Sequence, residues 1–553
     1  MLDLRATDPR DDKTRIEQTK GGLFKDSYRW ILKNADFQRW LHGDDQESRL
    51  LWIKGDPGKG KTMLLCGIID ELGSAAGDGV LSYFFCQGTD SRINNAVAVL
   101  RVLIFVLVDQ QQSLISHVQK KYEHSGKQLF GDKNTWAALT KIFGDILHDP
   151  SLKSTCFIID ALDECMTDLP QLLDLIMQHS SVPRVKCILS SRNRHDIEQK
   201  LMQDRSRTRL SLELNAEHVS CAVDAYIDHR VSGLASVHDD KALQDQLRDQ
   251  MRQKANGTFL WVALVFRELQ MVESWNVLQV IEQTPTDLIA LYDRMMTQIL
   301  QFKHNSEFCR LVLSTATSAY RPLHLRELGV LSGLPRDISN RIRNVERITD
   351  MCGSFLTTRN SYVYLIHQSA KDYLSTNTFA TIFPSGRADI HYGLFSRSLQ
   401  VMSETLHRDM YRLRDPGILI DQVIQPEPDP LAQARYSCVY WVDHFYDSDR
   451  GDDLQQGGKV GKFLSQKYLY WLEALSLLGN MSEGVLSILK LDSLLLVSIN
   501  YFTLPEICTN FSSEKSRRIP VDQPSSRNAP VYSVTQTSDR EHSSPDICVS
   551  TRI

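Results

Sequence analysis

Residues 55–62 carry the strongest chemical signal in the sequence. They read Gly-Asp-Pro-Gly-Lys-Gly-Lys-Thr, which fits the pattern GxxxxGK[ST] of a phosphate-binding loop, or P-loop. Glycines allow backbone N–H groups to turn inward around a polyphosphate, and a helix starting near Lys61 would add the partial positive charge of its N-terminus. We expect Lys61 to reach the β- and γ-phosphates and the Thr62 hydroxyl to ligate Mg²⁺. The expected nucleotide contacts in this stretch are Gly55, Asp56, Pro57, Gly58, Lys59, Gly60, Lys61, Thr62 and Met63.

An apolar run that ends in acid provides a second part of such a site. Residues 155–160 read Thr-Cys-Phe-Ile-Ile-Asp, and in doubly wound sheets ligands bind at the carboxyl ends of the strands. We expect Asp160 to hold Mg²⁺, mostly through water. Asp163 and Glu164 follow closely, and one of them could polarise the water that attacks a γ-phosphate. Read alone, these residues could also be a strand followed by an acidic helix cap.

A third apolar run ends in polar and basic residues. Residues 185–192 read VKCILSSR, so Arg192 falls at the end of a neighbouring strand. Its guanidinium carries a fixed charge that suits phosphate, and we expect it to sense the γ-phosphate. On these residues alone, an arginine in solvent is the alternative interpretation.

These residues need a sheet to bring them together, and the surrounding pattern predicts one. An apolar run of strand length precedes the glycine-rich loop, and apolar residues at helical spacing follow it. Strands alternating with helices indicate a doubly wound parallel sheet covered on both faces, which we assign to residues 21–215. Strands are expected at 50–53, 80–86, 155–160, 185–190 and 209–214, and helices at 95–108, 136–147 and 169–179.

The rest of the chain is mostly helical in pattern. The expected fold class is therefore an α/β P-loop domain followed by α-helical and winged-helix domains. We expect a linker at 1–20, a helical domain at 216–304, a winged-helix-like domain at 305–385 with a strand at 361–366, a second helical domain at 386–500 and a disordered tail at 501–553. Four tryptophans at helical spacing with aliphatic residues are expected in cores: Trp261, Trp275, Trp441 and Trp471.

Length and composition exclude several classes of protein. A chain of 553 residues is too long for one core, and its net charge of −5 gives no global basic field for nucleic acid. Eleven cysteines without CxxC pairs indicate reduced thiols rather than a disulfide framework or a zinc site. The N-terminus is polar, unlike a secretory signal, and no apolar run reaches the roughly 18 residues of a membrane span. We expect a cytoplasmic protein.

Taken together, the motifs resemble those of a known family. GDPGKGKT, FIIDALDEC and ILSSR are similar to the NACHT branch of the signal-transducing P-loop NTPases, especially the vegetative-incompatibility and NOD-like receptor group of filamentous fungi. The flanking stretches TDPRDDKTRIEQTKGGLFKDSYRWIL, ANGTFLWVALVFREL and LIHQSAKDYL agree, and the resemblance extends over about residues 4–496. It implies a switch that closes over ADP, opens and oligomerises on exchange for ATP, and hydrolyses ATP slowly.

The resemblance also implies roles for single residues. The winged helix of the family places a histidine against the β-phosphate of bound ADP, and His367 falls at that position. From the residues alone, His367 after a strand is an ordinary core or cap histidine. The other residues carried over are Lys61 and Thr62 for phosphate and Mg²⁺, Asp160 for the metal, Asp163 and Glu164 for the extended acidic box, and Arg192 for the sensor arginine.

Three features depart from the family pattern. Ala161 follows the metal acid where glycine is common, and Phe259 stands where relatives have a proline near the adenine, which puts the base contact in doubt. The chain also has no room for the N-terminal effector domain and C-terminal repeats of such receptors, so we expect a truncated gene product or a receptor core.

The sequence leaves the nucleotide base and two alternative functions open. The sequence does not distinguish ATP/ADP from GTP/GDP, and it names neither the activating signal nor the signalling partners. A fast ATPase or a small-molecule kinase is the alternative from the enzyme class, and a scaffold that has lost nucleotide use is the third. No convincing arginine-rich lid of a kinase is found, and intact Lys61, Thr62 and Asp160 argue against the scaffold.

Overall fold

The computed structural model describes residues 4, 7–43, 49–75, 79–125, 134–180, 182–201, 208–413, 418, 420–454 and 458–498. The tail expected at 501–553 lies outside the described residues. The chain divides into two compact units, residues 1–384 and 385–553.

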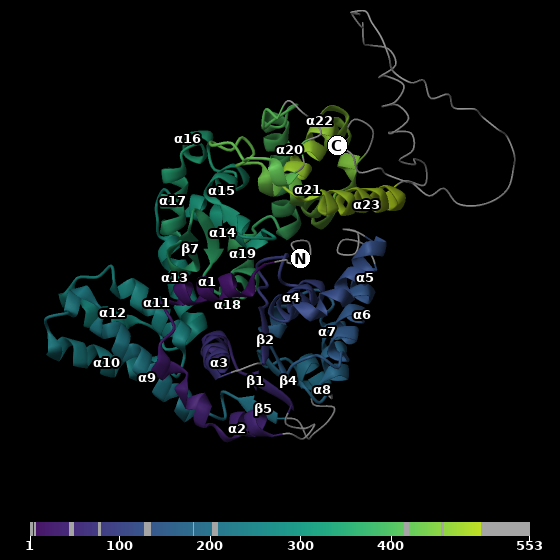
Figure 1. Ribbon diagram of the computed structural model, residues 1–553. Helices are drawn as coiled ribbons and strands as arrows, with labels where there is room; N and C mark the ends of the chain where they lie inside the picture. The colour runs from purple at the N-terminus through teal and green to yellow at the C-terminus, as the bar shows by residue number, and fades with distance from the viewer. Residues whose placement is uncertain are drawn as a thin grey trace, which may run out of the picture. The chain divides into compact units, whose positions relative to one another are not determined.

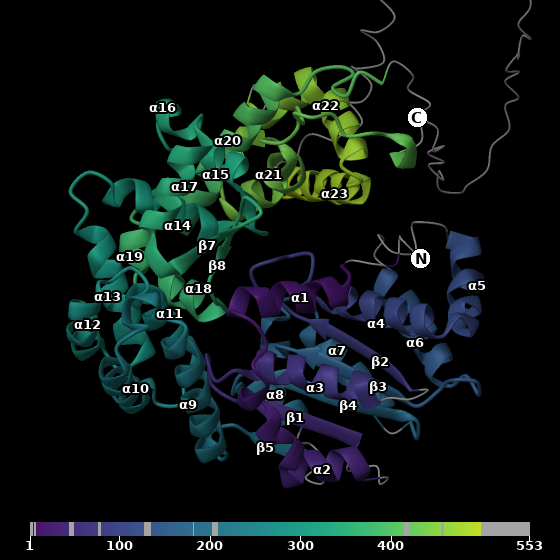
Figure 2. The same ribbon diagram turned by 60° about the vertical axis from the view of Figure 1, so that its left-hand side comes forward.

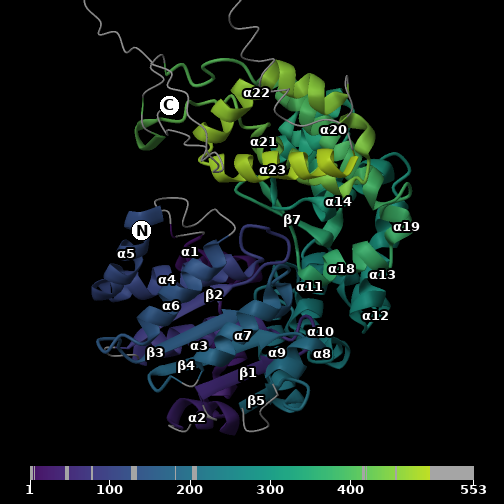
Figure 3. The same ribbon diagram turned by 90° about the vertical axis from the view of Figure 1, so that its right-hand side faces the viewer.

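A parallel sheet of five strands organises the first unit. Its strand order is β2-β3-β4-β1-β5, and each neighbouring pair is parallel, as Figures 2 and 3 show. This confirms the predicted α/β fold with a doubly wound sheet. The strands are β1 (Leu50–Lys54), β2 (Val80–Phe85), β3 (Thr155–Asp160), β4 (Val185–Ser191) and β5 (Thr208–Ser211).

Helices cover both faces of this sheet because its strands are apolar on both sides. The side chains of Trp52, Phe157 and Leu189 belong to one core with the nearly all-apolar helix α4. Helix α3 contacts β2, β3 and β4 and crosses the strands in Figure 2. The helices that follow the strands are α3 (Lys61–Ala75), α4 (Ala96–Gln110), α5 (Ile115–Ser125), α6 (Thr135–Leu147), α7 (Leu169–His179) and α8 (His195–Leu201).

The segment before the sheet contains a helix that the prediction of a linker at 1–20 missed. Helix α1 (Pro9–Lys20) starts at the capping side chain of Asp8 and ends at Gly21, whose φ is 89°. It contacts β2 and α3, and the Lys13 ammonium lies 2.7 Å from the Asp70 carboxylate of α3. Ion pairs therefore attach α1, which explains why its composition reads as a linker. Helix α2 (Ala35–His42) follows.

Residues 216–304 are helical, as Figure 1 shows for the group α9–α12. Trp261 is fully buried, but Trp275 is 76% exposed, so its expected place in a core is wrong. Trp275 lies in a short 3-10 helix at the turn before α12, where its side chain has little to pack against. The helices are α9 (Ala216–Ser232), α10 (Lys241–Ala255), α11 (Phe259–Leu269), α12 (Val277–Gln283) and α13 (Leu288–Leu300).

Residues 305–385, which we call the winged-helix-like segment, combine helices with a small antiparallel sheet of order β6-β8-β7. Its helices are α14 (Ser306–Ser318), α15 (Leu325–Leu331), α16 (Arg336–Ser339), α17 (Ile342–Met351), α18 (Gln368–Thr376) and α19 (Phe379–Ile382). Its strands are β6 (Leu323–His324), β7 (Leu356–Arg359) and β8 (Tyr362–Leu365). The hairpin β7–β8 leads directly into α18, which sets the position of His367 between them.

The second unit is a helical bundle in its described part. Trp441 and Trp471 are both fully buried, and their rings meet edge to face at 5.6 Å. Its helices are α20 (Arg387–Thr405), α21 (Arg435–Asp447), α22 (Lys459–Leu477) and α23 (Met481–Ser498). Across the described residues of both units, we find no helix with the length and apolar character needed to cross a bilayer.

Short 3-10 helices connect these elements. They are η2 (Lys25–Ser27), η3 (Arg29–Lys33), η5 (Gln112–Leu114), η7 (Leu162–Glu164), η8 (Ala235–Val237), η9 (Ser274–Asn276), η10 (Gly353–Phe355), η11 (Ile420–Gln422) and η12 (Gly451–Leu454). Of these, η7 matters most for the site, because it follows β3 immediately and carries two of the predicted acidic residues.

Candidate nucleotide-binding site

The glycine-rich loop joins β1 to α3 and has the backbone that a phosphate cradle requires. Gly58 and Gly60 have φ values of 81° and 85°, in the left-handed region that glycine adopts without strain. A Cβ atom at Gly60 would lie 2.8 Å from the ring of Phe259, so glycine is needed there for space as well. The Lys61 ammonium donates to the carbonyl oxygens of Gly55 at 2.5 Å and Asp56 at 3.0 Å. The cation is thus held inside the loop.

The two predicted metal ligands lie together below this loop. Asp160 ends β3 and is buried, which raises the pKa of its carboxyl group. The hydroxyls of Thr62 and Ser190 each donate a hydrogen bond to this carboxylate and oppose that rise. The structure therefore brings Thr62 and Asp160 into direct contact, although they are almost a hundred residues apart.

Ala161 explains one of the departures from the family pattern. Its φ and ψ are 54° and 50°, a left-handed conformation that glycine adopts freely and alanine does not. Its N–H donates to the Ser190 hydroxyl at 2.9 Å, which fixes the turn between β3 and η7. The turn keeps its geometry with alanine, at a cost in backbone strain.

Asp163 and Arg192 form an ion pair that extends to the winged-helix-like segment. The Arg192 backbone N–H donates to Asp163 Oδ1 at 2.9 Å, and its Nε lies 3.0 Å from Asp163 Oδ2. The Arg192 Nη1 donates to Asp372 Oδ2 of α18 at 2.6 Å. The Arg192 Nη2 is buried without a hydrogen-bond partner among the described residues. The predicted sensor arginine therefore holds two carboxylates and keeps one donor free.

Glu164 lies in a different environment from Asp163. Its Oε2 accepts a hydrogen bond from the Gly88 N–H at 2.8 Å, and no described cation pairs with it directly. Burial raises the pKa of Glu164 to about 7, and the nearby charge of Asp163 adds to the rise. Of the two acids left open by the sequence, Glu164 has a carboxyl group whose pKa lies near neutral pH.

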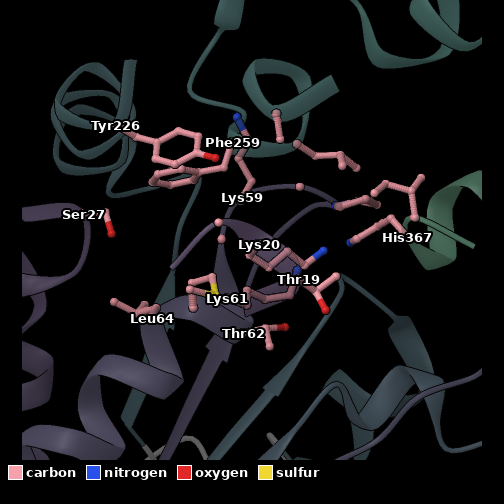
Figure 4. A pocket seen from close by; sticks show the side chains of 18 of the residues that line it. Thr19, Lys20, Ser27, Lys59, Lys61, Thr62, Leu64, Tyr226, Phe259 and His367 are labelled. Carbon is pink, nitrogen blue, oxygen red and sulfur yellow. The ribbon is translucent and has the colours of Figure 1, made fainter. Parts of the chain in front are cut away.

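His367 caps α18 and lines the same cavity as Lys61. Its Nδ1 accepts the Ser369 N–H at 3.1 Å, an arrangement that assigns the ring proton to Nε2. Burial lowers the pKa of His367 well below its usual value, and the charges of Lys20, Arg192 and Lys61 lower it further. The ring is therefore neutral and retains an N–H donor. Figure 4 shows the His367 ring directed toward Lys20 and Lys61.

The predicted site residues, apart from Gly55 and Asp56, line one cavity of about 340 Å³, within the size range of small-molecule sites. Much of its lining was not predicted from the sequence. The N-terminal segment contributes Thr19, Lys20, Gly21, Gly22, Phe24, Ser27 and Trp30, the helical segment Tyr226, Arg230 and Arg267, and the winged-helix-like segment Thr357 and Arg359. One signal for the N-terminal part of the lining was present in the sequence, because the adjacent glycines Gly21 and Gly22 are typical of a tight turn. In the structure their φ values are 89° and 94°.

Phe259 lies in this lining rather than away from it. Its ring is 5.6 Å from that of Tyr226, and Figure 4 shows the two on one wall. The Leu260 N–H donates to the Gly58 carbonyl at 3.3 Å, and the Lys59 ammonium donates to the Asn256 carbonyl at 2.9 Å. The start of α11 is therefore held on the glycine-rich loop, and Tyr226 and Phe259 form an aromatic wall beside it.

These residues fit a nucleotide with Mg²⁺. The glycine backbone forms the cradle, Thr62 and Asp160 supply the oxygen ligands that Mg²⁺ prefers, and Arg192 Nη2 offers a buried donor without a partner. The strand order β2-β3-β4-β1-β5, with the loop after β1 and the acid after β3, completes the arrangement. The fold and the site together define the class of the α/β P-loop NTPases.

Comparison with known proteins identifies the family within this class. The profile of the Nephrocystin 3, N-terminal family matches residues 26–192. The vegetative incompatibility protein HET-E-1 of Podospora anserina is 51% identical over 517 residues, which cover 90% of this chain and 38% of that protein. The chain belongs to the fungal NACHT proteins similar to HET-E-1, and it spans less than half the length of this relative.

Solved structures align only weakly with the chain. A Walker-type ATPase of Pyrococcus abyssi has a TM-score of 0.28 and 13% identity, covering 62% of this chain and 93% of its own. The Orc1 protein of Aeropyrum pernix, solved in complex with DNA, has a TM-score of 0.27 and 13% identity, covering 65% and 93%. Scores this low support no conclusion about function.

The strain at Ala161 leads to a first prediction. Ala161→Gly should raise the free energy of unfolding by about 0.5 kcal/mol, because release of the left-handed strain outweighs the extra chain entropy of glycine. Denaturant unfolding of the full chain measures the change. The matched control is Ala137→Gly in the exposed face of α6, which should lower stability by about 1 kcal/mol. Equal losses in both variants would contradict the strain at Ala161.

Proposed function

We propose that this chain is a nucleotide-dependent signalling switch. It binds ATP or ADP, or the guanine equivalents, with Mg²⁺, hydrolyses the triphosphate slowly, and oligomerises when it opens. The observation that carries this proposal is that the glycine-rich loop, Glu164 and His367 line one cavity, although they come from three separate segments. The relative HET-E-1 is named a vegetative incompatibility protein, which supports a setting in fungal incompatibility. We place the switch in the cytoplasm, in non-self recognition or programmed cell death.

The phosphate chain of the nucleotide would be held by the loop that joins β1 to α3. Backbone N–H groups of residues 55–62 and the Lys61 ammonium would bind it, and the N-terminus of α3 would favour its charge. Thr62 and Asp160 would hold Mg²⁺, which when bound neutralises phosphate charge. Tyr226 and Phe259 would offer their aromatic wall to the base, in place of the proline of relatives.

Glu164 is the better candidate for the general base of hydrolysis. Its carboxylate, with a pKa of about 7, can take a proton from the attacking water near neutral pH. Asp163 already accepts two bonds from Arg192 and would act by positioning that arginine. Because Arg192 also binds Asp372 through Nη1, only its Nη2 donor is left for a γ-phosphate in this arrangement. This engagement would keep hydrolysis slow.

Two contacts would hold the diphosphate state closed. The His367 Nε2–H is free to donate to a β-phosphate, since Nδ1 is occupied by the Ser369 N–H. The Arg192–Asp372 pair ties the end of β4 to α18. A contact available only in the closed state biases the switch by its differential free energy. A γ-phosphate that takes Arg192 from Asp372 would weaken the closed state.

Nucleotide binding itself is the first test. Lys61→Ala should weaken ADP binding by about 10- to 100-fold, since a charge-assisted contact to phosphate is worth about 1.5 to 3 kcal/mol. Isothermal titration calorimetry of the full chain with Mg²⁺ measures the affinity, and Lys25→Ala, on the exposed N-terminal segment, is the control. Wild-type protein that binds no nucleotide would refute the switch. A turnover of several per second would favour a fast ATPase or kinase instead.

The pKa of Glu164 gives a pH dependence with a definite sign. A general base acts when deprotonated, so the hydrolysis rate at saturating nucleotide should rise about tenfold per pH unit below pH 7 and level off above it. Glu164→Gln should abolish this rise and slow hydrolysis at least about 100-fold while nucleotide still binds. If Asp163→Asn removes the pH dependence and Glu164→Gln keeps it, the two roles are exchanged.

The Arg192–Asp372 pair can be tested through nucleotide release. Asp372→Asn should speed release of a fluorescent ADP about two- to fivefold, because a half-exposed ion pair is worth at most about 1 kcal/mol. Stopped-flow fluorescence measures the rate. Asp337→Asn, on the exposed helix α16 of the same segment, should leave it unchanged. Unchanged or slower release in Asp372→Asn would contradict a closing role for the pair.

A further inference from the structure

Three cations of the cavity lining have no role in the site described so far. Lys20 ends α1, Arg267 lies on the third turn of α11, and Arg359 ends β7. No ion pair to a carboxylate is found for any of the three among the described residues. Arg359 Nη2 donates to the Gln18 carbonyl at 2.9 Å, and Arg267 Nη2 to the Thr357 hydroxyl at 3.4 Å, so their acceptors are neutral.

The positive charge of Arg359 repels the positive charges of both Lys20 and Arg267. Burial lowers the pKa of Lys20, and the Arg359 charge lowers it further, although Glu164 and Asp160 act against this. Burial and the Arg359 charge likewise lower the pKa of Arg267. Buried like charges are costly unless an anion compensates them. Arg359 is within electrostatic reach of both other cations, so the three form one cluster.

An unsatisfied atom gives independent evidence for a ligand here. Arg267 Nη1 is buried and has no hydrogen-bond partner among the described residues. A planar guanidinium presents its donors in a fork that matches phosphate oxygens. A second cavity of about 780 Å³ adjoins the first and shares Lys20, Glu164 and His367 with it, and Arg359 lines both. Lys20 and Arg359 thus line both cavities, and Arg267 lines the first.

We propose that Lys20, Arg267 and Arg359 form a second phosphoryl-binding subsite, beside the glycine-rich loop. The subsite takes a dianionic phosphoryl group, which is either the terminal phosphate of the bound nucleotide or a separate phosphate ion. This subsite extends the proposed function. Where the phosphoryl group belongs to the nucleotide, the subsite rests on the proposed nucleotide binding. Since the three cations come from α1, α11 and the β7–β8 hairpin, an occupied subsite joins three segments through one anion.

Binding of a separate phosphate ion is tested by thermal unfolding of the full chain loaded with ADP and Mg²⁺. Replacing chloride by inorganic phosphate at equal ionic strength should raise the Tm of the wild type by about 2 °C. Arg267→Met and Lys20→Met should lose this response, and Arg267→Met should also raise the Tm in chloride because it removes a buried like charge. Arg343→Gln, on the exposed face of α17, should respond as the wild type does.

Whether the terminal phosphate of the nucleotide occupies the subsite is tested by calorimetry on the same proteins. If the terminal phosphate occupies the subsite, the wild type shows no phosphate response, and Arg267→Met and Lys20→Met lower affinity for a non-hydrolysable ATP analogue about tenfold relative to ADP. Variants that match the wild type in both the phosphate response and the analogue-to-ADP ratio overturn the subsite. Failure of the wild type to bind ADP refutes the switch instead, so the two failures are told apart.

Discussion

The buried carboxylate of Asp160 is the constraint on which the site depends. A charge at the end of β3 can stay there only if donors surround it, and the hydroxyls of Thr62 and Ser190 are those donors. Thr62 starts α3 and Ser190 lies in β4, so satisfying one carboxylate fixes the ends of three elements. The turn at Ala161 is strained for the same purpose, since its N–H completes the bond to Ser190.

Polar contacts attach the segments outside the sheet to this centre. Lys59 and Gly58 each bind backbone groups near the start of α11, and Arg192 binds Asp372 on α18. Around the cavity, Lys20, Arg267 and Arg359 have no carboxylate partner among the described residues, so an anionic ligand would stabilise the arrangement. In the function that we propose, such a site would couple the identity of the nucleotide to the contacts among segments.

The sequence predicted the sheet and the central residues well, because apolar runs of strand length end directly before chemically distinctive residues. Asp160 and Arg192 could be assigned to neighbouring strand ends on that basis. Helix α1 was missed because ion pairs rather than an apolar face attach it, and periodicity does not report ion pairs. Lys20 and Arg359 were missed since their proximity depends on long-range contacts. Trp275 was misplaced because helical spacing does not show where a helix ends.

The bond from Arg359 to the Gln18 carbonyl ties the β7–β8 hairpin to the last turn of α1. Helix α1 is about 18 Å long at 1.5 Å per residue, and its C-terminal end reaches the cavity through Lys20. A movement of α1 would therefore be transmitted through Lys20 to the ligand site. A displacement of α1 would reach the hairpin and Lys20 together, and also the strand β2 that α1 contacts. Mechanical load and bound ligand would then compete for the same few contacts.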